Sequence, residues 1–258
     1  SMLDLATTNS ELALNEKCLL IERSKHETVG AIQELSEALG IAYIETIEAF
    51  DHSNIQGTNP VSAMVVYKDG KPERKAYRKY KIKTVEGSHE FATTQEVIRR
   101  RYTRLLREQK PLPDLILMDG GKIQVRAAKE VLEDELGLVI PVAGMVKDNK
   151  HRTASLLFND ELVELDPRSQ AFHLVQRIQD EVHRFAITFH RQVRGKNSFS
   201  SQLDQVEGVG PKTRNKVLKH FKTMKRMREA DLEEFQKLGI PLKVAENIKD
   251  SFKTEVPK

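Results

Sequence analysis

The sequence contains a single cysteine and no long apolar run. Because Cys18 is the only cysteine among 258 residues, no disulfide can form within the chain. This usage is typical of the reducing cytoplasm, and we interpret Cys18 as an ordinary buried thiol. No segment approaches the ~20 apolar residues of a membrane-spanning helix, and no secretory signal opens the sequence. We therefore expect a cytoplasmic protein without a membrane anchor, and the start at Ser1-Met2 leads us to expect a fragment of a longer chain.

A large excess of one charge is also missing. Lys and Arg number 42 against 38 Asp and Glu, which gives a formal net charge of +4 and a pI near 9.0. This balance is weak evidence for nucleic-acid binding. The distribution says more, because basic residues gather within 99–107 and again within 212–228. A basic run is most often a solvated helix face, and we interpret the first cluster in this way, whereas the second has a motif beside it.

The order of apolar patterns predicts an α/β fold. Strands are predicted at residues 43–50, 63–67, 77–82, 115–118 and 142–146, with one or two short strands within 151–165. Helices are predicted within 3–39 and at 90–107, 124–136 and 169–194. Three antiparallel strands, then helix, strand, helix, strand and a last helix, are the order of the RNase H-like fold, a mixed sheet flanked by helices. In that fold the first and fourth strands are neighbours.

Two aspartates come at the ends of apolar runs in these two strands. Asp51 follows residues 47–50 and Asp119 follows 115–118, so both side chains are expected together where the chain leaves the core. Adjacent carboxylates repel each other unless a proton or a cation relieves the repulsion. Hard oxygen ligands of this kind suit Mg²⁺ or Mn²⁺. The sequence therefore predicts a metal site for phosphate chemistry.

The last long helix offers a third member of this site. His183 lies on the flank of the apolar face, from which a side chain can reach the edge of the sheet. An isolated histidine there would usually bond a neighbour, but with two aspartates at that edge we favour a metal ligand or a proton carrier. Asp180 and Glu181 are alternative contributors. His190 lies on the same flank two turns further on and is a secondary candidate.

Two glycine hairpins indicate a DNA-binding unit near the C-terminus. Gly208 and Gly210 permit a tight turn, and Pro211 suits the first turn of a following helix. Amide groups at that helix start can bind a phosphate oxygen. A second copy at 238–248 predicts a tandem helix-hairpin-helix unit that binds duplex backbone with little sequence selectivity, and a plain helical bundle with glycine turns is the alternative. The predicted DNA contacts are Gly208, Val209, Gly210, Lys212, Arg214, Gly239, Ile240 and Lys243, with Lys122 and Arg78 in the first domain.

Several motifs together resemble one family. They lie at residues 50–57, 77–80, 99–102, 118–122, 147–152, 180–186 and 190–191. These residues resemble the C-terminal half of the UvrC family, the nuclease subunit of bacterial nucleotide excision repair. The resemblance implies an Asp-Asp-His catalytic triad at Asp51, Asp119 and His183, and a further acidic position at Glu90, where the family more often has aspartate. His52 departs from the family, which has an apolar residue at that position.

The resemblance also implies the activity and its partners. It implies a metal-dependent endonuclease that makes the 5′ incision in damaged duplex DNA, or in DNA already nicked 3′ of a lesion, together with UvrB and a complex loaded by UvrA. The 3′ incision is expected of a GIY-YIG domain in the half of the family that these residues do not match. We predict four parts: a helical extension at 1–40 that packs on the nuclease domain, an RNase H-like endonuclease domain at 41–194, a linker at 195–202 and the hairpin domain at 203–258.

Two other classes of function are compatible with the same residues. The chain could be a non-catalytic DNA-binding module in which the hairpins bind DNA and the first domain is scaffold. It could also be a different RNase H-like nuclease that cuts RNA–DNA hybrids or junctions. Metal-dependent nicking would exclude the first alternative, and a comparison of hybrid with damaged duplex would separate the second.

Overall fold

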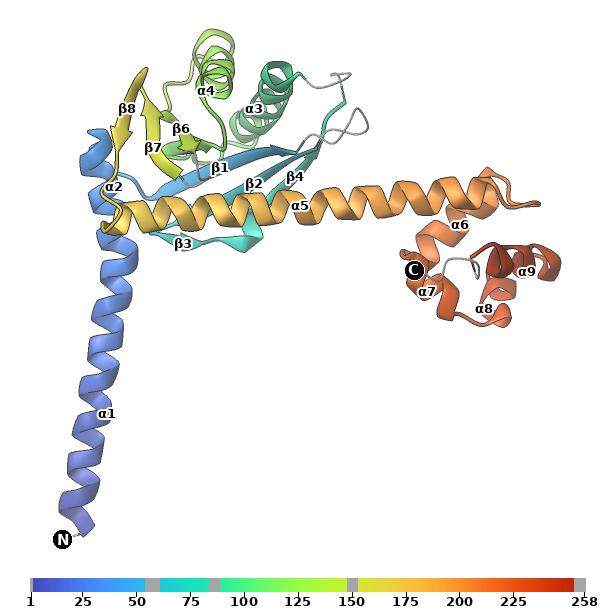
Figure 1. The fold of residues 1–258 in the computed structure, drawn as a ribbon, viewed down its shortest axis with the longest axis horizontal. Helices are drawn as coiled ribbons and strands as arrows, with labels where there is room; N and C mark the ends of the chain where they lie inside the picture. Colours follow the sequence, from blue (N-terminus) through green and yellow to red (C-terminus); the bar gives the residue numbers. More distant parts are fainter. Residues whose placement is uncertain (1, 54–60, 84–88, 148–152, 253–258) are drawn as a thin grey trace. The chain divides into compact units, whose positions relative to one another are not determined.

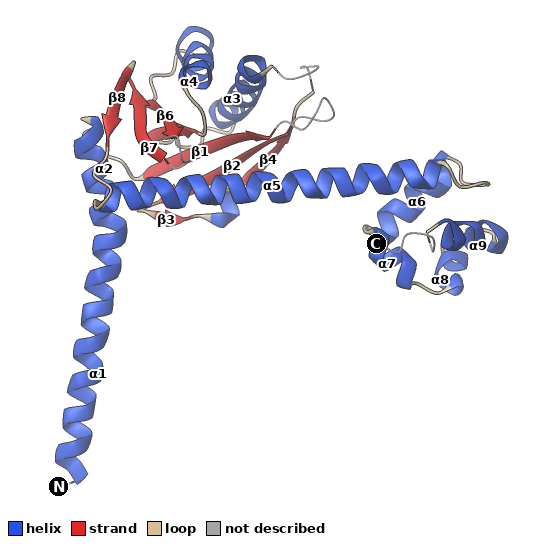
Figure 2. Cartoon of the chain, viewed as in Figure 1, coloured by secondary structure: helices blue, strands red, loops and turns tan. Residues whose placement is uncertain are grey.

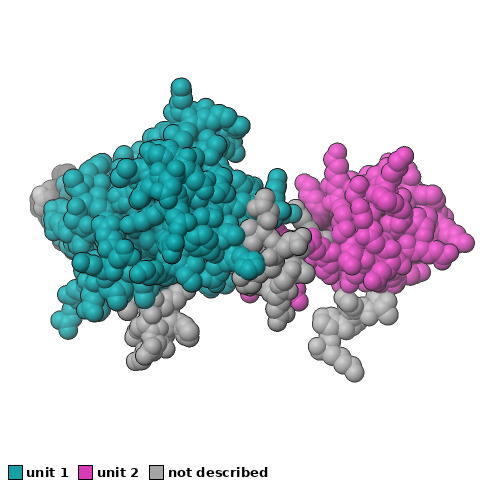
Figure 3. Space-filling view, turned by 90° about the horizontal axis from the view of Figure 1, so that it is seen from above, with its two compact units in different colours: residues 1–189 teal, residues 190–258 magenta. Residues whose placement is uncertain are grey.

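The computed structural model describes residues 2–53, 61–83, 89–147 and 153–252. The chain divides into two compact units, residues 1–189 and 190–258, which are described separately (Figure 3). Among the described residues, no helix combines the length and the apolar character that a bilayer crossing requires.

One mixed sheet forms the centre of the first unit (Figures 1 and 2). Its strands are β1 (Thr46–Ser53), β2 (Val61–Lys68), β3 (Lys71–Pro72), β4 (Arg78–Lys81), β5 (Leu115–Met118), β6 (Val142–Lys147), β7 (Thr153–Phe158) and β8 (Glu161–Glu164). They pair in the order β3-β2-β1-β5-β6-β7-β8, and β4 also pairs with β2. The β1–β5 and β5–β6 pairs are parallel, and the other pairs are antiparallel. The mixed RNase H-like sheet and the contact between the first and fourth predicted strands are thus confirmed.

Helices cover both faces of this sheet (Figure 1). The helices of the first unit are α1 (Met2–Lys25), α2 (Ala31–Leu39), α3 (Glu90–Arg107), α4 (Lys122–Lys129) and the start of α5 (Gln170–Asp204). Two π-helical segments, η1 (His26–Gly30) and η3 (Glu130–Glu135), and a 3-10 turn, η2 (Arg74–Ala76), accompany them. On one face, Ile47 and Ala49 of β1 pack with α2 and α5. On the other, Phe50 of β1 packs with α3 and α4. The alternation of strand side chains sends odd-numbered residues of β1 toward α5 and even-numbered ones toward α3.

Strand β1 begins and ends three residues later than predicted. It runs from Thr46 to Ser53, so Asp51 lies inside the strand and not at its end. The prediction was wrong because pairing sets the boundary: β1 stays in register with β2 from Thr46↔Lys68 to Ser53↔Val61. Asp119 does follow its strand, because β5 ends at Met118.

Asp69 and Gly70 form the turn between β2 and β3. Both residues have positive φ, 50° and 73°, the conformation of a tight two-residue hairpin turn. A Cβ at Gly70 would lie 2.6 Å from the carbonyl oxygen of Thr28, so glycine is also required for the close approach of η1.

Among the residues whose side chains are described, from 13 onward, the N-terminal extension packs on the sheet through its second half. Ala31, Leu35 and Leu39 of α2 belong to the core on the α5 face. By contrast, the side chains at 13–25 of α1 are exposed, and Cys18 is exposed rather than buried. For this part of α1 the prediction of packing was wrong, as was that of a buried thiol.

Residues 195–202 are helical, although their composition predicted a linker. They belong to α5, a helix of 35 residues that ends at Asp204. Burial overrides composition here, because Phe199 and Leu203, four residues apart on one helix face, are at most 1% exposed in the core of the second unit.

The second unit is helical throughout its described residues, 190–252, apart from the connecting turns. Besides the end of α5 it contains α6 (Pro211–Phe221), α7 (Met224–Glu229), α8 (Leu232–Lys237) and α9 (Leu242–Ser251). Its core includes Phe221, Phe235 and Phe252, and the rings of Phe221 and Phe235 lie 4.7 Å apart between centroids. This unit contains the two predicted glycine hairpins.

Candidate active site and nucleic-acid interface

The parallel β1–β5 pair brings the two predicted aspartates together. Phe50 is in register with Met118, and the amide of Asp119 donates to the carbonyl of Phe50 at 2.8 Å. Asp51 and Asp119 are therefore neighbours at the same level of the sheet. Asp51 has the parity of Ile47 and Ala49, so its side chain lies on the α5 face.

His183 approaches the aspartates from α5. That helix is held on the sheet by Val175, Ile178 and Val182, all fully buried. His183 Nδ1 lies 3.1 Å from Asp51 Oδ2 and 4.0 Å from Asp119 Oδ2. One ligand atom from each of the three residues falls within 4.8 Å of the others. This donor set, two carboxylate oxygens and an imidazole nitrogen, fits a divalent cation.

The two carboxylates of the cluster are buried against the sheet, and the imidazole of His183 is exposed to solvent. The side chains of Asp51 and Asp119 are 10% and 4% exposed, whereas that of His183 is 56% exposed. Two carboxylates so close together in a sheltered position repel each other, and a bound cation would relieve this repulsion.

Gln179 also belongs to this cluster, and the sequence reading missed it. Its Nε2 donates to Asp119 Oδ1 at 2.8 Å, which fixes the orientation of that carboxylate. The signal was available in retrospect, because Gln179 precedes His183 by four residues and so shares its helix face.

The histidine beside Asp51 faces the other way. His52 Nε2 lies 3.0 Å from Thr94 Oγ1 of α3, and Nδ1 is buried without a hydrogen-bond partner among the described residues. Burial lowers the pKa of His52 to about 4, against an opposing influence of the Asp119 charge. His52 is therefore neutral at pH 7 and adds no positive charge on the α3 side of the sheet, opposite to the carboxylates.

The two secondary candidates are not among the described residues that converge on this site. Glu90 begins α3, and its Oε2 accepts a hydrogen bond from Gln124 Nε2 at 2.7 Å. His190 lies seven residues beyond His183 on α5 and is 8% exposed. The described residues that form the possible metal group are Asp51, Asp119 and His183 alone. Residues 54–57 and 148–152 of the family motifs lie outside the described residues.

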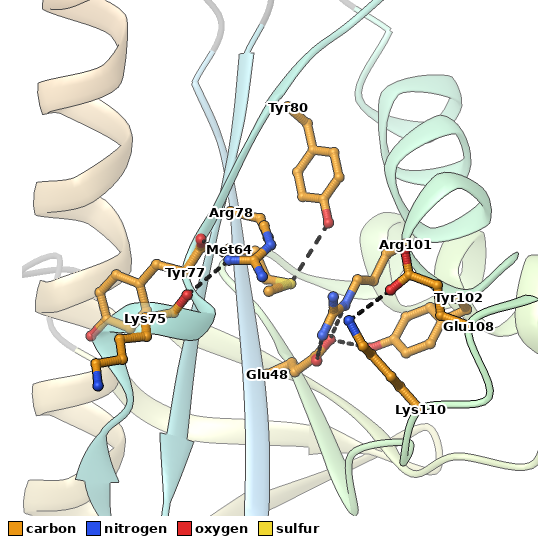
Figure 4. Close-up of polar contacts among 10 residues, drawn as sticks. All are labelled: Glu48, Met64, Lys75, Tyr77, Arg78, Tyr80, Arg101, Tyr102, Glu108 and Lys110. Carbon is orange, nitrogen blue, oxygen red and sulfur yellow. Dashed lines mark hydrogen bonds and ion pairs between the residues drawn. The ribbon is translucent and has the colours of Figure 1, made fainter. Parts of the chain in front are cut away.

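The basic residues Arg78 and Lys79 of β4 make different contacts. The guanidinium of Arg78 donates to the carbonyls of Lys75 and Tyr77 at 2.9 and 2.8 Å (Figure 4). Its neighbour Lys79 pairs through Ala63 of β2 with Asp51 of β1, so Lys79 and Asp51 lie in one cross-strand row. The Lys79 ammonium lies 4.9 Å from the ring centroid of Phe185 on α5. Lys79 is thus a basic side chain of β4 on the face of the carboxylate cluster, whereas Arg78, the predicted DNA contact, has the opposite strand parity.

Lys122 is largely exposed at the start of α4. Its Nζ lies 3.7 Å from Asp160, and both side chains are more than 75% exposed, so this ion pair is weak. The predicted phosphate contact through Lys122 therefore stays a prediction.

In the second unit, each glycine hairpin leads directly into a helix. Gly208 has φ of 85° and Gly239 has φ of 68°, the left-handed region that favours glycine. Helices α6 and α9 begin three residues after these glycines, and in each helix the second residue is an exposed lysine, Lys212 or Lys243. This arrangement offers amide donors and a positive charge to a phosphate.

Arg214 is engaged differently from the prediction. Its Nη1 lies 2.9 and 3.0 Å from the two carboxylate oxygens of Asp204 at the end of α5. The guanidinium thus ties α6 to α5 within the second unit, and its role as a DNA contact remains a prediction.

Comparison with known proteins follows the same division of the chain. The model of the UvrC RNase H endonuclease domain matches residues 36–187, more than half of the sequence. The chain belongs to the UvrC family. A model of the SAM-like helix-hairpin-helix tandem matches residues 200–254. An RNase H-like endonuclease domain followed by a helix-hairpin-helix domain is therefore the composition of this UvrC-family chain.

Curated relatives match almost all of the chain. UvrABC system protein C of Pediococcus pentosaceus is 60% identical over 253 residues, which are 97% of this chain and 43% of that protein. The same protein of Latilactobacillus sakei subsp. sakei is 60% identical over 254 residues, 96% of this chain and 43% of that protein. The chain thus spans less than half the length of these relatives. A crystal structure of Ciona intestinalis endonuclease V with inosine-containing DNA aligns with a TM-score of 0.31 at 18% identity, over 52% of this chain and 60% of that one.

Proposed function

We propose that this chain is the part of a UvrC protein that makes the 5′ incision in nucleotide excision repair. The observation that carries this proposal is the convergence of Asp51, Asp119 and His183 at two adjacent central strands of an RNase H-like sheet. The same chain carries a helix-hairpin-helix tandem, which would bind the phosphates of a duplex backbone. The substrate we propose is damaged duplex DNA, or duplex DNA already nicked 3′ of a lesion, presented by UvrB after loading by UvrA.

The three converging residues would hold Mg²⁺ or Mn²⁺. When bound, such an ion would supply Lewis-acid stabilisation of the phosphate charge and would make a water more acidic. The role of the protein is to fix the ligands: β1 and β5 set the spacing of Asp51 and Asp119, and Gln179 orients Asp119. His183 is more exposed than either aspartate, so its imidazole is placed either to complete the ligand set or to carry a proton to or from solvent.

The function is tested by nicking of a lesion duplex that already carries a 3′ nick, with Mn²⁺, Mg²⁺ or EDTA. We expect metal-dependent cutting on the 5′ side of the lesion, mapped with an end-labelled strand. Asp119→Asn should abolish cutting, whereas the matched control Asp134→Asn, at an exposed carboxylate of η3, should not. Cutting that persists in Asp119→Asn would contradict the assigned site. An equal rate on an RNA–DNA hybrid would favour the hybrid-cutting alternative.

The two roles of His183 predict different results for His183→Asn. If the imidazole is a ligand, the metal concentration for half-maximal cutting rises and excess metal restores the rate. If it carries a proton, the metal requirement is unchanged, and the rate falls without being restored by excess metal.

A further inference from the structure

The two hairpins of the second unit are related by an internal repeat. When Gly208 is aligned with Gly239, Lys212 corresponds to Lys243, and Val217 corresponds to Ile248. Both members of the latter pair are fully buried in the same core. The two halves therefore present the same positions to the shared core.

Each hairpin is hydrogen-bonded by the helix that follows the other hairpin. Lys216 Nζ of α6 donates to the carbonyl of Leu238 at 2.9 Å, and Asn247 Nδ2 of α9 donates to the carbonyl of Glu207 at 3.2 Å. Leu238 and Glu207 each immediately precede the glycine of their hairpin. Lys216 and Asn247 each follow their own glycine by eight residues, so donors and acceptors occupy equivalent positions in the repeat.

The packing around the glycines has the same reciprocal form. A Cβ at Gly208 would lie 2.9 Å from Val244 Cγ2 of α9, and a Cβ at Gly239 would lie 3.5 Å from Lys216 Nζ of α6. Each left-handed glycine thus faces the helix of the opposite half. The two hydrogen bonds are made to the residue before each glycine, next to the amides that would face a phosphate.

We propose that Lys216 and Asn247 are positioning residues that lock the two hairpins at a fixed separation, so that both engage one duplex at once. The inference rests on the proposed DNA binding by the hairpins and adds a role for two residues outside the turns. Lys216 lies in a basic run with Lys212 and Lys219, yet its ammonium is directed to a backbone carbonyl at the end of α8. It acts on DNA through the second hairpin, and Asn247 acts through the first.

The salt dependence of binding separates this role from a phosphate contact. For each phosphate contact that is lost, the slope of log Kobs against log salt falls in magnitude by about 0.9. We expect Lys216→Met and Asn247→Leu each to weaken binding of the full chain to a 20-base-pair duplex by roughly 5–10-fold with an unchanged slope. When the separation of the hairpins is no longer fixed, the effective concentration of the second hairpin at its site on the duplex falls. Lys212→Met, the matched lysine at a helix start, should weaken binding and reduce the slope.

Amide hydrogen exchange without DNA tests the lock independently of the proposed function. Lys216→Met should speed exchange at the amides of 238–240 and leave those of 207–210 unchanged, and Asn247→Leu should do the reverse. A reduced slope in Lys216→Met would make Lys216 a phosphate contact and overturn the proposal. So would unchanged affinity and exchange in both variants. Absence of DNA binding in the unmodified chain, with the exchange pattern as expected, would contradict DNA binding by the hairpins and leave the lock in place.

Discussion

The two faces of β1 hold buried acids in opposite ways. Glu48 faces α3, where it accepts hydrogen bonds from the Arg101 guanidinium and, at 2.9 Å, from the Tyr102 hydroxyl (Figure 4). Asp51, three residues later, faces α5, where a second carboxylate and an imidazole lie nearby. The protein supplies a buried countercharge for the first acid. For the second it gathers a ligand set whose repulsion favours a cation from solution.

Two acids on a single strand are therefore expected to have different roles, Glu48 in the stability of the fold and Asp51 in the chemistry of the site. Glu48 and Arg101 are 3% and 13% exposed, so each depends on the other to offset the cost of burial. Removal of Glu48 should therefore act mainly on folding, and removal of Asp51 mainly on cutting. Four substitutions test this contrast, in decreasing order of expected effect.

Asp51→Asn should reduce nicking by on the order of 10³-fold, which corresponds to about 4 kcal/mol of transition-state stabilisation. Its free energy of unfolding in EDTA should be equal or higher, because one of two repelling carboxylates is neutralised. The measurements are single-turnover nicking with Mn²⁺ and urea denaturation in EDTA. Strong destabilisation of this variant would show that Asp51 has the same role as Glu48.

Glu48→Ala should lower the free energy of unfolding by about 3–5 kcal/mol, because it leaves the Arg101 guanidinium buried without its carboxylate. Urea denaturation gives the change. The double substitution Glu48→Leu with Arg101→Met should be less destabilising than Glu48→Ala, since it removes both charges and keeps the volume. A double variant as unstable as the single one would argue against an electrostatic origin.

His52→Leu should remove part of the acid sensitivity of the fold. Because the folded-state pKa of His52 is lowered to about 4 from 6.5, its neutral form stabilises the protein fully above pH 6.5. That contribution is lost as the pH falls from 6.5 toward 4, and between pH 7.5 and 5 the loss is up to about 2 kcal/mol. Urea midpoints of the two proteins at both pH values, in EDTA, measure the difference. Equal acid sensitivity in the two proteins would show that His52 does not titrate in this way.

Tyr102→Phe should cost about 1 kcal/mol of stability, the smallest effect of the four. It removes one hydrogen bond to Glu48 but leaves the Arg101 pair in place. Thermal unfolding suffices as the measurement, and nicking by the folded protein should be unchanged. A loss as large as that of Glu48→Ala would mean that the hydroxyl, and not the guanidinium, is the main partner of Glu48.

The sequence predicted the sheet more reliably than the ends of its elements. The apolar runs at 47–50 and 115–118 identified two strands, and the element order predicted that they are neighbours, which brings Asp51 and Asp119 together. The end of β1 and the length of α5 depend on partners that are distant in the sequence. Strand β1 continues because β2 pairs with it, and α5 continues through 195–202 because Phe199 and Leu203 are buried.

The sequence by itself determined the residue types, the periodicities and the motifs that place this chain in the UvrC family. The tertiary structure decided which polar groups are paired. Glu48 and Asp51 are both acids on the same strand, but side chains alternate between the two faces of a sheet. Glu48 therefore contacts the Arg101 guanidinium on one face, and Asp51 lies beside the Asp119 carboxylate on the other. Lys216 and Asn247 have no distinctive sequence signal, because their partners lie 22 and 40 residues away. Contacts of that range are formed only when the helices pack.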